Sequence, residues 1–183
     1  MGYTKIYNTL FLDRDGVINK HLIGDYVKSP QEFIFLEGVV EALKELSLLF
    51  RHILIVSNQR GVGKGIMSMD DLYEIHKFML DIINAGGGRI DKIYICTDIE
   101  ESSPNRKPNI GMIHQALKDF PDIDLKKSWM VGDSRSDIQF ANKAQISMAL
   151  VGDKYNMPKD ELRIDMYCPN LLTFAKQLKK THI

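Results

Sequence analysis

Two aspartates directly follow an apolar stretch near the start of the chain. The residues Leu10–Leu12 run into Asp13 and Asp15, and Gly16 comes next. Side chains alternate along an extended chain, so Asp13 and Asp15 would face the same side while Arg14 turns away. Two adjacent carboxylates repel each other unless a cation lies between them, and a hard divalent metal prefers such oxygen ligands. The spacing therefore predicts a metal-dependent reaction centre, although a solvated turn after an edge strand would leave the same pattern.

Three more reactive residues stand at the ends of predicted strands or at the start of a predicted helix. Ser57 and Asp133 each come shortly after a further apolar stretch, and Lys107 precedes Pro108. The carboxyl ends of parallel strands meet at one edge of a sheet, so these side chains should lie near the two aspartates. A metal and a lysine neutralise phosphate charge, one carboxylate can attack phosphorus, and a second can transfer a proton. Together the residues predict phosphoryl transfer, whereas each one alone could be an ordinary surface group.

The elements that would position these residues alternate along the chain. Apolar runs typical of strands alternate with stripes of helical period, which predicts an α/β protein with a three-layer, Rossmann-like parallel sheet and helices on both faces. Residues 16–36 are expected to form an irregular flap, the loop of Gly61, Gly63 and Gly65 to be supple, and Pro108 to start a helix. We predict one domain over residues 1–183, with strands at 6–12, 52–56, 92–96, 129–132, 148–151 and 165–168 and helices at 37–50, 68–84, 108–120, 135–145 and 171–180.

The composition is that of an ordinary globular protein. Of the 183 residues 44% are hydrophobic and 26% charged, and 24 basic residues balance 24 acidic ones. This balance disfavours nucleic acid and anionic membranes as partners, because both need a strong positive field. No apolar stretch is long enough to span a bilayer, and none of signal-peptide length precedes Asp13, so we expect a cytoplasmic monomer without a membrane partner. Cys96 and Cys168 are far apart and are expected to be reduced thiols.

Four motifs occur in a definite order along the chain. They are Asp13-Arg14-Asp15-Gly16-Val17, then Ser57, then Lys107, then Gly132-Asp133-Ser134-Arg135-Ser136-Asp137. In this order they resemble the four motifs of the haloacid dehalogenase (HAD) superfamily of phosphohydrolases, and the resemblance covers nearly the whole chain. It implies a HAD-like fold and a phosphatase whose partner is a small phosphorylated molecule.

The resemblance also implies a role for each matching residue. Asp13 would be the nucleophile that forms an aspartyl-phosphate, and Asp15 the general acid and base. Ser57 and Lys107 would hold the phosphoryl group that is transferred. A carboxylate flanked by a metal and a lysine stays ionised at neutral pH, which suits the role of Asp13.

The implied metal is Mg²⁺. Asp13, the backbone carbonyl of Asp15 and Asp133 would bind it, and Asp137 would support these ligands or serve the structure. Many members of one group within this superfamily also carry a zinc site of four Cys and His ligands before the Arg-Lys-Pro motif. Here Cys96 is present, but Thr97–Asn105 contains neither Cys nor His, so we expect no zinc. This departure leaves the exact substrate open.

Finer features are similar to one group within the superfamily. The arginine of Asp-Arg-Asp-Gly, the sequence Ser57-Asn58-Gln59 before a glycine-rich loop, and Arg106-Lys107-Pro108 resemble the group that contains D-glycero-D-manno-heptose 1,7-bisphosphate phosphatases and histidinol-phosphatase domains. That group has no cap domain, and the predicted elements here leave no room for one. The candidate substrate-binding residues are then Arg14, Asn19, His21, Tyr26, Asn58, Gln59, Arg60, Lys64, Arg106 and Ser134.

Several functions stay open at this point. The leading hypothesis is a Mg²⁺-dependent phosphatase for a sugar bisphosphate, whose second phosphate Arg106 would bind through its fork of donors with help from Lys64. Histidinol phosphate is an alternative substrate. A polynucleotide 3′-phosphatase shares the Asn-Gln and Lys-Pro features, but it should show a basic groove, which the balanced charge disfavours. A binding module without catalysis is the remaining alternative, and the complete set of catalytic residues argues against it.

Overall fold

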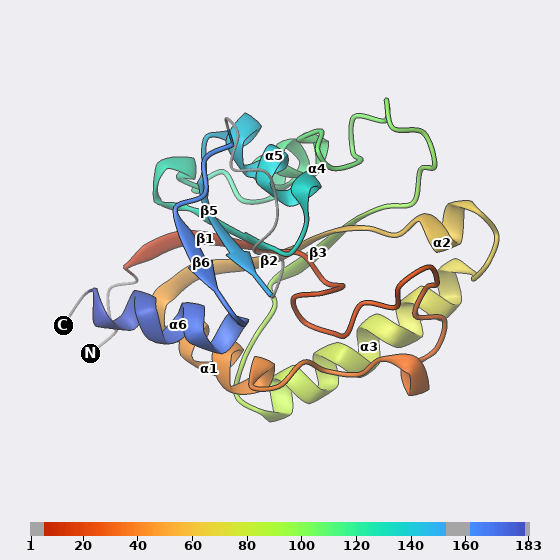
Figure 1. Ribbon diagram of the computed structural model, residues 1–183, viewed down its shortest axis with the longest axis horizontal. Helices are drawn as coiled ribbons and strands as arrows, with labels where there is room; N and C mark the ends of the chain where they lie inside the picture. The colour runs from red at the N-terminus through yellow and green to blue at the C-terminus, as the bar shows by residue number, and fades with distance from the viewer. Residues whose placement is uncertain (1–5, 153–161, 182–183) are drawn as a thin grey trace.

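The six strands found among the described residues form one parallel sheet (Figure 1). The computed structural model describes residues 6–152 and 162–181. The strand order is β3-β2-β1-β4-β5-β6. The strands are β1 (Tyr7–Leu12), β2 (Phe50–Asn58), β3 (Lys92–Cys96), β4 (Trp129–Gly132), β5 (Ser147–Val151) and β6 (Met166–Cys168). The helices are α1 (Val39–Leu49), α2 (Arg60–Gly63), α3 (Met69–Ala85), α4 (Gly111–Asp119), α5 (Arg135–Ala144) and α6 (Leu171–Lys180), with 3₁₀ turns η1 (Pro30–Glu32) and η2 (Leu125–Lys127).

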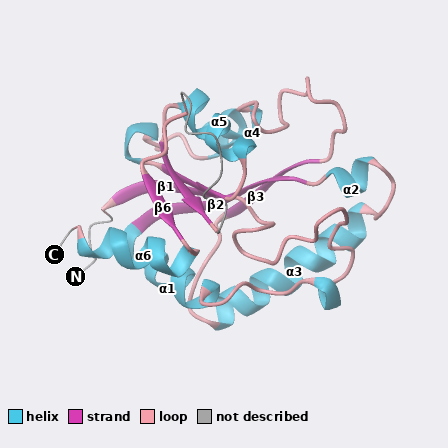
Figure 2. Ribbon diagram, viewed as in Figure 1, coloured by secondary structure: helices cyan, strands magenta, loops and turns pink. Residues whose placement is uncertain are grey.

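Helices cover both faces of this sheet, which confirms the predicted three-layer α/β fold. Helices α1, α3 and α6 lie on one face and α4 and α5 on the other (Figure 2). Alternation along the central strand divides its side chains between the two layers. Leu10 and Leu12 join the core under α1 and α6, whereas Phe11 joins the core under α4 and α5. A strand buried on both faces must be apolar throughout, which is why β1 reads as a continuous apolar run.

The strand order changes direction at β1, and this places the candidate residues. Leu12 pairs with Ile55 of β2 on one side and with Val131 of β4 on the other. The backbone N–H of Asp13 then donates to the carbonyl of Val131 at 3.0 Å. In an open parallel sheet the crevice beyond the carboxyl ends of the strands, where the order reverses, is the usual ligand site.

Residues 16–36, predicted to be an irregular flap, are tied to the body of the protein. The N–H of Gly16 donates to the carbonyl of Asn19 at 2.8 Å, and that of Leu36 donates to the carbonyl of Ile18 at 3.0 Å. Ile18 and Phe33 are buried in the core beside α1 and α3. Within the described residues, the segments between the motifs contain strands of the sheet, helices that pack on it and the short elements η1 and α2. No cap domain is found in these described segments.

Two local predictions were wrong. The glycine-rich loop is not simply supple, because α2 forms within it and its glycines allow close packing. A Cβ at Gly63 would lie 2.0 Å from the carbonyl oxygen of Thr97. Pro108 does not start α4, which begins at Gly111. The intervening residues form a turn, in which the N–H of Gly111 donates to the carbonyl of Pro104 at 2.8 Å.

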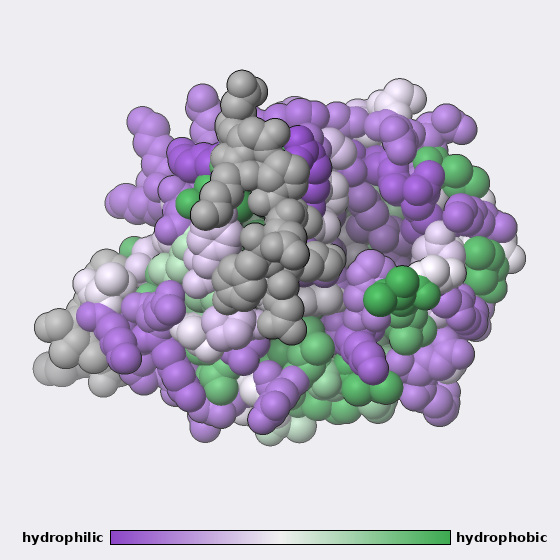
Figure 3. Space-filling model, viewed as in Figure 1, coloured by the Kyte–Doolittle hydropathy of each residue, from purple (hydrophilic) through white to green (hydrophobic). Residues whose placement is uncertain are grey.

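The surface is hydrophilic over much of the face shown in Figure 3, and hydrophobic residues gather on the side of α1 and α3. Within the described residues, no helix has the length and apolar character needed to cross a membrane.

Candidate active site

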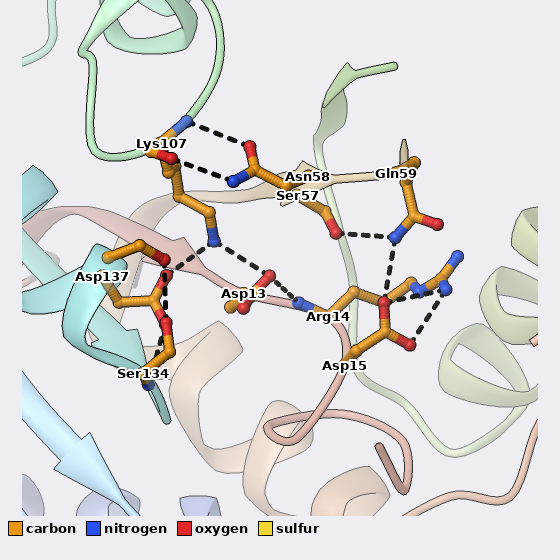
Figure 4. A network of polar contacts seen from close by, with 10 residues as sticks. Asp13, Arg14, Asp15, Ser57, Asn58, Gln59, Lys107, Ser134 and Asp137 are labelled. Carbon is orange, nitrogen blue, oxygen red and sulfur yellow. Dashed lines mark hydrogen bonds and ion pairs between the residues drawn. The ribbon is translucent and has the colours of Figure 1, made fainter. Parts of the chain in front are cut away.

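A buried lysine joins two carboxylates at the carboxyl ends of β1 and β4. Lys107 Nζ lies 3.0 Å from Asp13 Oδ1 and 2.6 Å from Asp137 Oδ1 (Figure 4). The side chains of Lys107 and Asp137 are 1% and 0% exposed. The N–H of Arg14 also donates to Asp13 Oδ1 at 2.8 Å, so this oxygen is held by two donors. This ion pair orients the Asp13 carboxylate, because the Lys107 side chain is shielded from water and needs the carboxylate as its partner.

Burial and charge shift the ionisation of these groups in defined directions. Burial raises the pKa of Asp13 to about 7, while the charge of Lys107 acts to lower it. Burial alone would lower the pKa of Lys107, but the charges of Asp13 and Asp137 outweigh it and raise the pKa to about 12. Lys107 is therefore a permanent cation, and the charge of Asp13 depends on its cationic neighbours.

Three carboxylates form a cluster that could hold a metal ion. Asp13, Asp133 and Asp137 each offer an oxygen, and these oxygens lie within 4.8 Å of one another. Two glycines make room for them. A Cβ at Gly16 would lie 2.2 Å from Asp133 Oδ2, and a Cβ at Gly132 would lie 2.3 Å from Asp137 Cβ. A donor set of carboxylates alone suits a hard cation such as Mg²⁺, so the residues present fit that ion.

Asp15 lies outside this cluster, in a cage of donors of its own. Arg14 Nη2 donates to both carboxylate oxygens at 2.9 Å, Asn19 Nδ2 to Oδ1 at 2.9 Å and Gln59 Nε2 to Oδ2 at 2.9 Å. Burial favours the neutral acid, but the Arg14 charge and these hydrogen bonds prevail and hold the pKa of Asp15 below its usual value. The two aspartates of the first motif thus have opposite environments.

The end of β2 positions both groups. Asn58 makes a pair of hydrogen bonds with the backbone of Lys107, donating to its carbonyl at 3.1 Å and accepting from its N–H at 3.0 Å. Gln59 donates to the hydroxyl of Ser57 at 2.8 Å as well as to Asp15. Strand β2 therefore holds the lysine through Asn58 and the second aspartate through Gln59.

A cavity of about 240 Å³ opens above these groups. It reaches from the acidic cluster to the flap after β1, where His21 and Tyr26 form its wall. Ser136, which the sequence analysis did not select, also contributes. The predicted residues that line it are Asp13, Arg14, Asp15, His21, Tyr26, Asn58, Gln59, Lys107, Asp133 and Ser134.

Comparison with known proteins gives consistent relatives. A family model described as HAD-hydrolase-like matches residues 104–175. The D-glycero-alpha-D-manno-heptose-1,7-bisphosphate 7-phosphatase of Mycobacterium bovis is 40% identical over 134 residues, which are 73% of this chain and 70% of that protein. The D-glycero-beta-D-manno-heptose-1,7-bisphosphate 7-phosphatase of Rhodopseudomonas palustris is 36% identical over 144 residues, which are 74% of this chain and 78% of that protein. The chain belongs to the HAD-like phosphatase family.

The solved structure of a similar phosphatase has the same fold as this chain. The crystal structure of D,D-heptose 1,7-bisphosphate phosphatase from B. bronchiseptica, complexed with magnesium and phosphate, has a TM-score of 0.84 and 29% identity. The similarity covers 95% of this chain and 99% of that one. The predicted resemblance to this family, and to its heptose bisphosphate phosphatase group, is thereby confirmed.

Two predicted substrate-binding residues of this HAD-like phosphatase are buried beside Asp15. Arg14 is 1% exposed and Asn19 is 0% exposed. Their side-chain nitrogens donate to Asp15 and hold that carboxylate, and Arg14 is also one of the residues that line the cavity. The reason is that the chain turns sharply after Asp15, which folds residues 16–19 back on it.

The predicted basic residues lie beside the cavity and gather near Tyr26. Lys64 Nζ lies 5.6 Å from the centroid of the Tyr26 ring. Arg60 Nη2 donates to the carbonyl of Ile99 at 3.1 Å. Burial lowers the pKa of Arg106, and the positive charge of Arg60 lowers it further because the two side chains lie near each other. These three basic side chains therefore form a rim around Tyr26 and do not line the cavity itself.

Sequence reasoning missed His76, which contacts the first motif. Its Nε2 lies 3.2 Å from Arg14 Nη1. The signal was present in the helical pattern, because Leu72, Ile75, His76 and Met79 share the buried stripe of α3. A histidine on an apolar stripe indicates a buried polar partner elsewhere in the fold.

We expect the contribution of Asp13 to the stability of the metal-free enzyme to fall as pH rises through the pKa of its carboxyl group. That pKa is about 7 in the folded chain against an ordinary value of 3.8. The Asp13 carboxyl group therefore binds more protons in the folded state than in the unfolded state between these values, and its contribution to the free energy of unfolding decreases with rising pH. Asp13→Asn removes this titration, so its stability relative to wild type should increase from about pH 4 to about pH 8, by roughly 1–4 kcal/mol.

Urea denaturation of both proteins in the presence of a chelator measures this difference. Lys107 does not contribute within the window, because its raised pKa lies far above it. Parallel stability curves for the two proteins would show that Asp13 does not titrate with a raised pKa.

Proposed function

We propose that the protein is a Mg²⁺-dependent phosphomonoester hydrolase that forms an aspartyl-phosphate on Asp13. The proposed substrate is D-glycero-D-manno-heptose 1,7-bisphosphate or a similar sugar bisphosphate. The observation that carries the proposal is the buried Lys107 ammonium between Asp13 and Asp137 at the cavity floor. Its charge counteracts the burial that raises the pKa of Asp13, which favours the ionised nucleophile, and it offers positive charge to a phosphoryl group. The names of the bacterial relatives support the choice of substrate.

In the proposed reaction the two aspartates of the first motif divide the work. A carboxylate oxygen of Asp13 attacks phosphorus, and the bond from phosphorus to the leaving oxygen breaks. Asp15 gives its proton to that oxygen. Asp15 then accepts a proton from the water that attacks the aspartyl-phosphate, and phosphate leaves with Asp13 restored. Lys107 and Ser57 hold the phosphoryl oxygens during both steps.

The environment of Asp15 suits a group that changes its proton affinity during the cycle. Without ligand, Arg14 and the two amides keep the pKa of Asp15 low. A phosphate beside Asp13 adds negative charge nearby, which raises the pKa of Asp15 and allows it to carry a proton. Loss of that charge with the product returns Asp15 to its ionised form.

We assign the metal to the acidic cluster. Asp13, Asp133 and the backbone carbonyl of Asp15 would hold Mg²⁺, and Asp137 keeps its ion pair with Lys107. Bound Mg²⁺ supplies positive charge against the phosphoryl oxygens. The absence of a zinc site in the loop after Cys96 stays a prediction. A single domain over residues 1–183, a monomeric state and a cytoplasmic location also stay predictions.

The size of the cavity supports a substrate that extends beyond it. About 240 Å³ is less than the 300–1,000 Å³ typical of a pocket that encloses a whole small molecule. A second phosphate would then fall at the rim, where Arg106, Arg60 and Lys64 gather near Tyr26. Arg106 is our choice for that phosphate because its planar fork binds phosphate through two bonds.

A screen of phosphate release tests the proposed function. Wild-type protein with Mg²⁺ should release phosphate fastest from heptose bisphosphate, and Asp13→Asn should lose this turnover because an amide is a poor nucleophile. Histidinol phosphate, a 3′-phosphorylated oligonucleotide and an aryl phosphate complete the panel. A preference for histidinol phosphate or for the oligonucleotide would identify that compound as the substrate in place of heptose bisphosphate. No turnover on any compound would favour a binding module without catalysis.

The metal assignment is tested by two glycines with similar backbone angles. Gly16 and Gly24 have φ of +87° and +79°, so alanine strains the backbone at both. A Cβ at Gly16 collides with Asp133, whereas a Cβ at Gly24 has no atom within 4 Å. Gly16→Ala should therefore raise the Mg²⁺ concentration for half-maximal activity by roughly 10–100-fold, and Gly24→Ala should leave it unchanged. Equal shifts in the two Mg²⁺ titrations would remove Asp133 from the metal site.

The bisphosphate preference is tested at Arg106. Arg106→Ala should lower kcat/KM for the bisphosphate by about ten- to a hundredfold, because a charge-assisted contact contributes about 1.5–3 kcal/mol. The loss for a monophosphate should be much smaller. Arg51→Ala is the control, since Arg51 is exposed near the opposite end of β2. An equal loss on both substrates would mean that Arg106 acts on Lys107 and not on a remote phosphate.

A further inference from the structure

A line of contacts runs from helix α3 to the second aspartate. His76 is 7% exposed, and its Nε2 lies 3.2 Å from Arg14 Nη1. The other terminal nitrogen of Arg14, Nη2, donates to both oxygens of Asp15 at 2.9 Å. The guanidinium therefore bridges a histidine and a carboxylate that are 61 residues apart in the chain.

Few groups hold the Arg14 guanidinium in place. It is 1% exposed, so water does not serve as its main partner. Its Nε has no hydrogen-bond partner among the described residues, and the Phe33 ring lies 6.0 Å from its Cζ. Hydrogen bonds to Asp15 alone would hold Nη2 in place, but they would not fix the rotation of the guanidinium plane. His76 supplies the second point of attachment that determines the orientation of the plane.

The contact also defines the chemical state of His76. Arginine only donates hydrogen bonds, so Nε2 of His76 must accept, and the ring is neutral with its hydrogen on Nδ1. Burial, followed by the charge of Arg14, lowers the pKa of His76 to about 4, which agrees with a neutral ring.

His76 does not reach the reaction cavity. It lies instead in the wall of a groove between α3 and β3, together with Tyr73, Leu80 and Ile93. A residue that touches neither the cavity nor a reacting group can influence the reaction only through Arg14.

We propose that His76 is a positioning residue for proton transfer, which orients the Arg14 guanidinium and through it the carboxylate of Asp15. This inference rests on the proposed function, in which Asp15 is the general acid and base. It assigns to α3 the role of setting the direction in which Asp15 presents its proton.

A pair of amide substitutions tests the inference. In His76→Gln the side-chain carbonyl is about as far from the backbone as Nε2 and can accept from Arg14, whereas His76→Asn is one methylene too short. His76→Asn should lower kcat for an alkyl phosphate roughly tenfold, a part of the 10²–10⁴ that a positioned acid supplies. KM should stay the same, and His76→Gln should restore most of the loss. The same variants should change kcat little for an aryl phosphate, whose leaving group needs no proton.

Two further variants separate this inference from the proposed function. Asp15→Asn should lose turnover on the alkyl phosphate far more than on the aryl phosphate, and adding His76→Asn to it should cost nothing more. Tyr73→Leu, in the wall of the same groove but exposed, should behave as wild type.

Each outcome has one meaning. If Asp15→Asn loses equally on both substrates, the proposed acid role fails. If Asp15→Asn behaves as expected but the two His76 amides lose equally, or His76→Asn adds its full effect to Asp15→Asn, then His76 is only structural.

Discussion

The site depends on the buried ammonium group of Lys107. Lys107 lies between Asp13 and Asp137 with almost no exposure, and an ammonium in such a place is stable only while both carboxylates stay close. Each neighbouring element contributes to this arrangement. Asn58 holds the Lys107 backbone, and Gly132 leaves the space into which Asp137 fits. A change at any of these positions would leave a buried charge without its partner.

Two carboxylates that are neighbours in the sequence acquire different properties from this architecture. Asp13 is buried beside other acids, and its pKa is raised, whereas Asp15 is caged by donors and its pKa is lowered. Environments that separate the pKa values of paired acids are how enzymes divide the roles of nucleophile and proton carrier. Here the division follows from which groups surround each side chain: a lysine and acids for Asp13, an arginine and amides for Asp15.

In the proposed function, a small cavity and a basic rim would share the recognition of the substrate. The cavity has room for a phosphoryl group and its immediate surroundings, while the basic side chains of Arg60, Lys64 and Arg106 stand around Tyr26 beside it. Close packing at Gly61 brings α2 against Tyr26, since a Cβ there would lie 3.0 Å from the ring. The rim is therefore a property of how the flap after β1 meets the loop after β2.

The sequence alone determined the succession of strands and helices along the chain, the family and the set of residues at the strand ends. The elements and the residues at the strand ends follow from local signals, because hydrophobic period and the placement of acids after apolar runs are visible along the chain. The family followed from the resemblance of the four motifs. The tertiary structure decided which group faces which. It turned Arg14 and Asn19 toward Asp15, placed the basic residues on a rim, began α4 at Gly111 and brought His76 from α3 to the first motif. Such contacts join segments that are distant in sequence or fold back in three dimensions. The helical pattern that indicates burial of His76 does not say which residue it contacts.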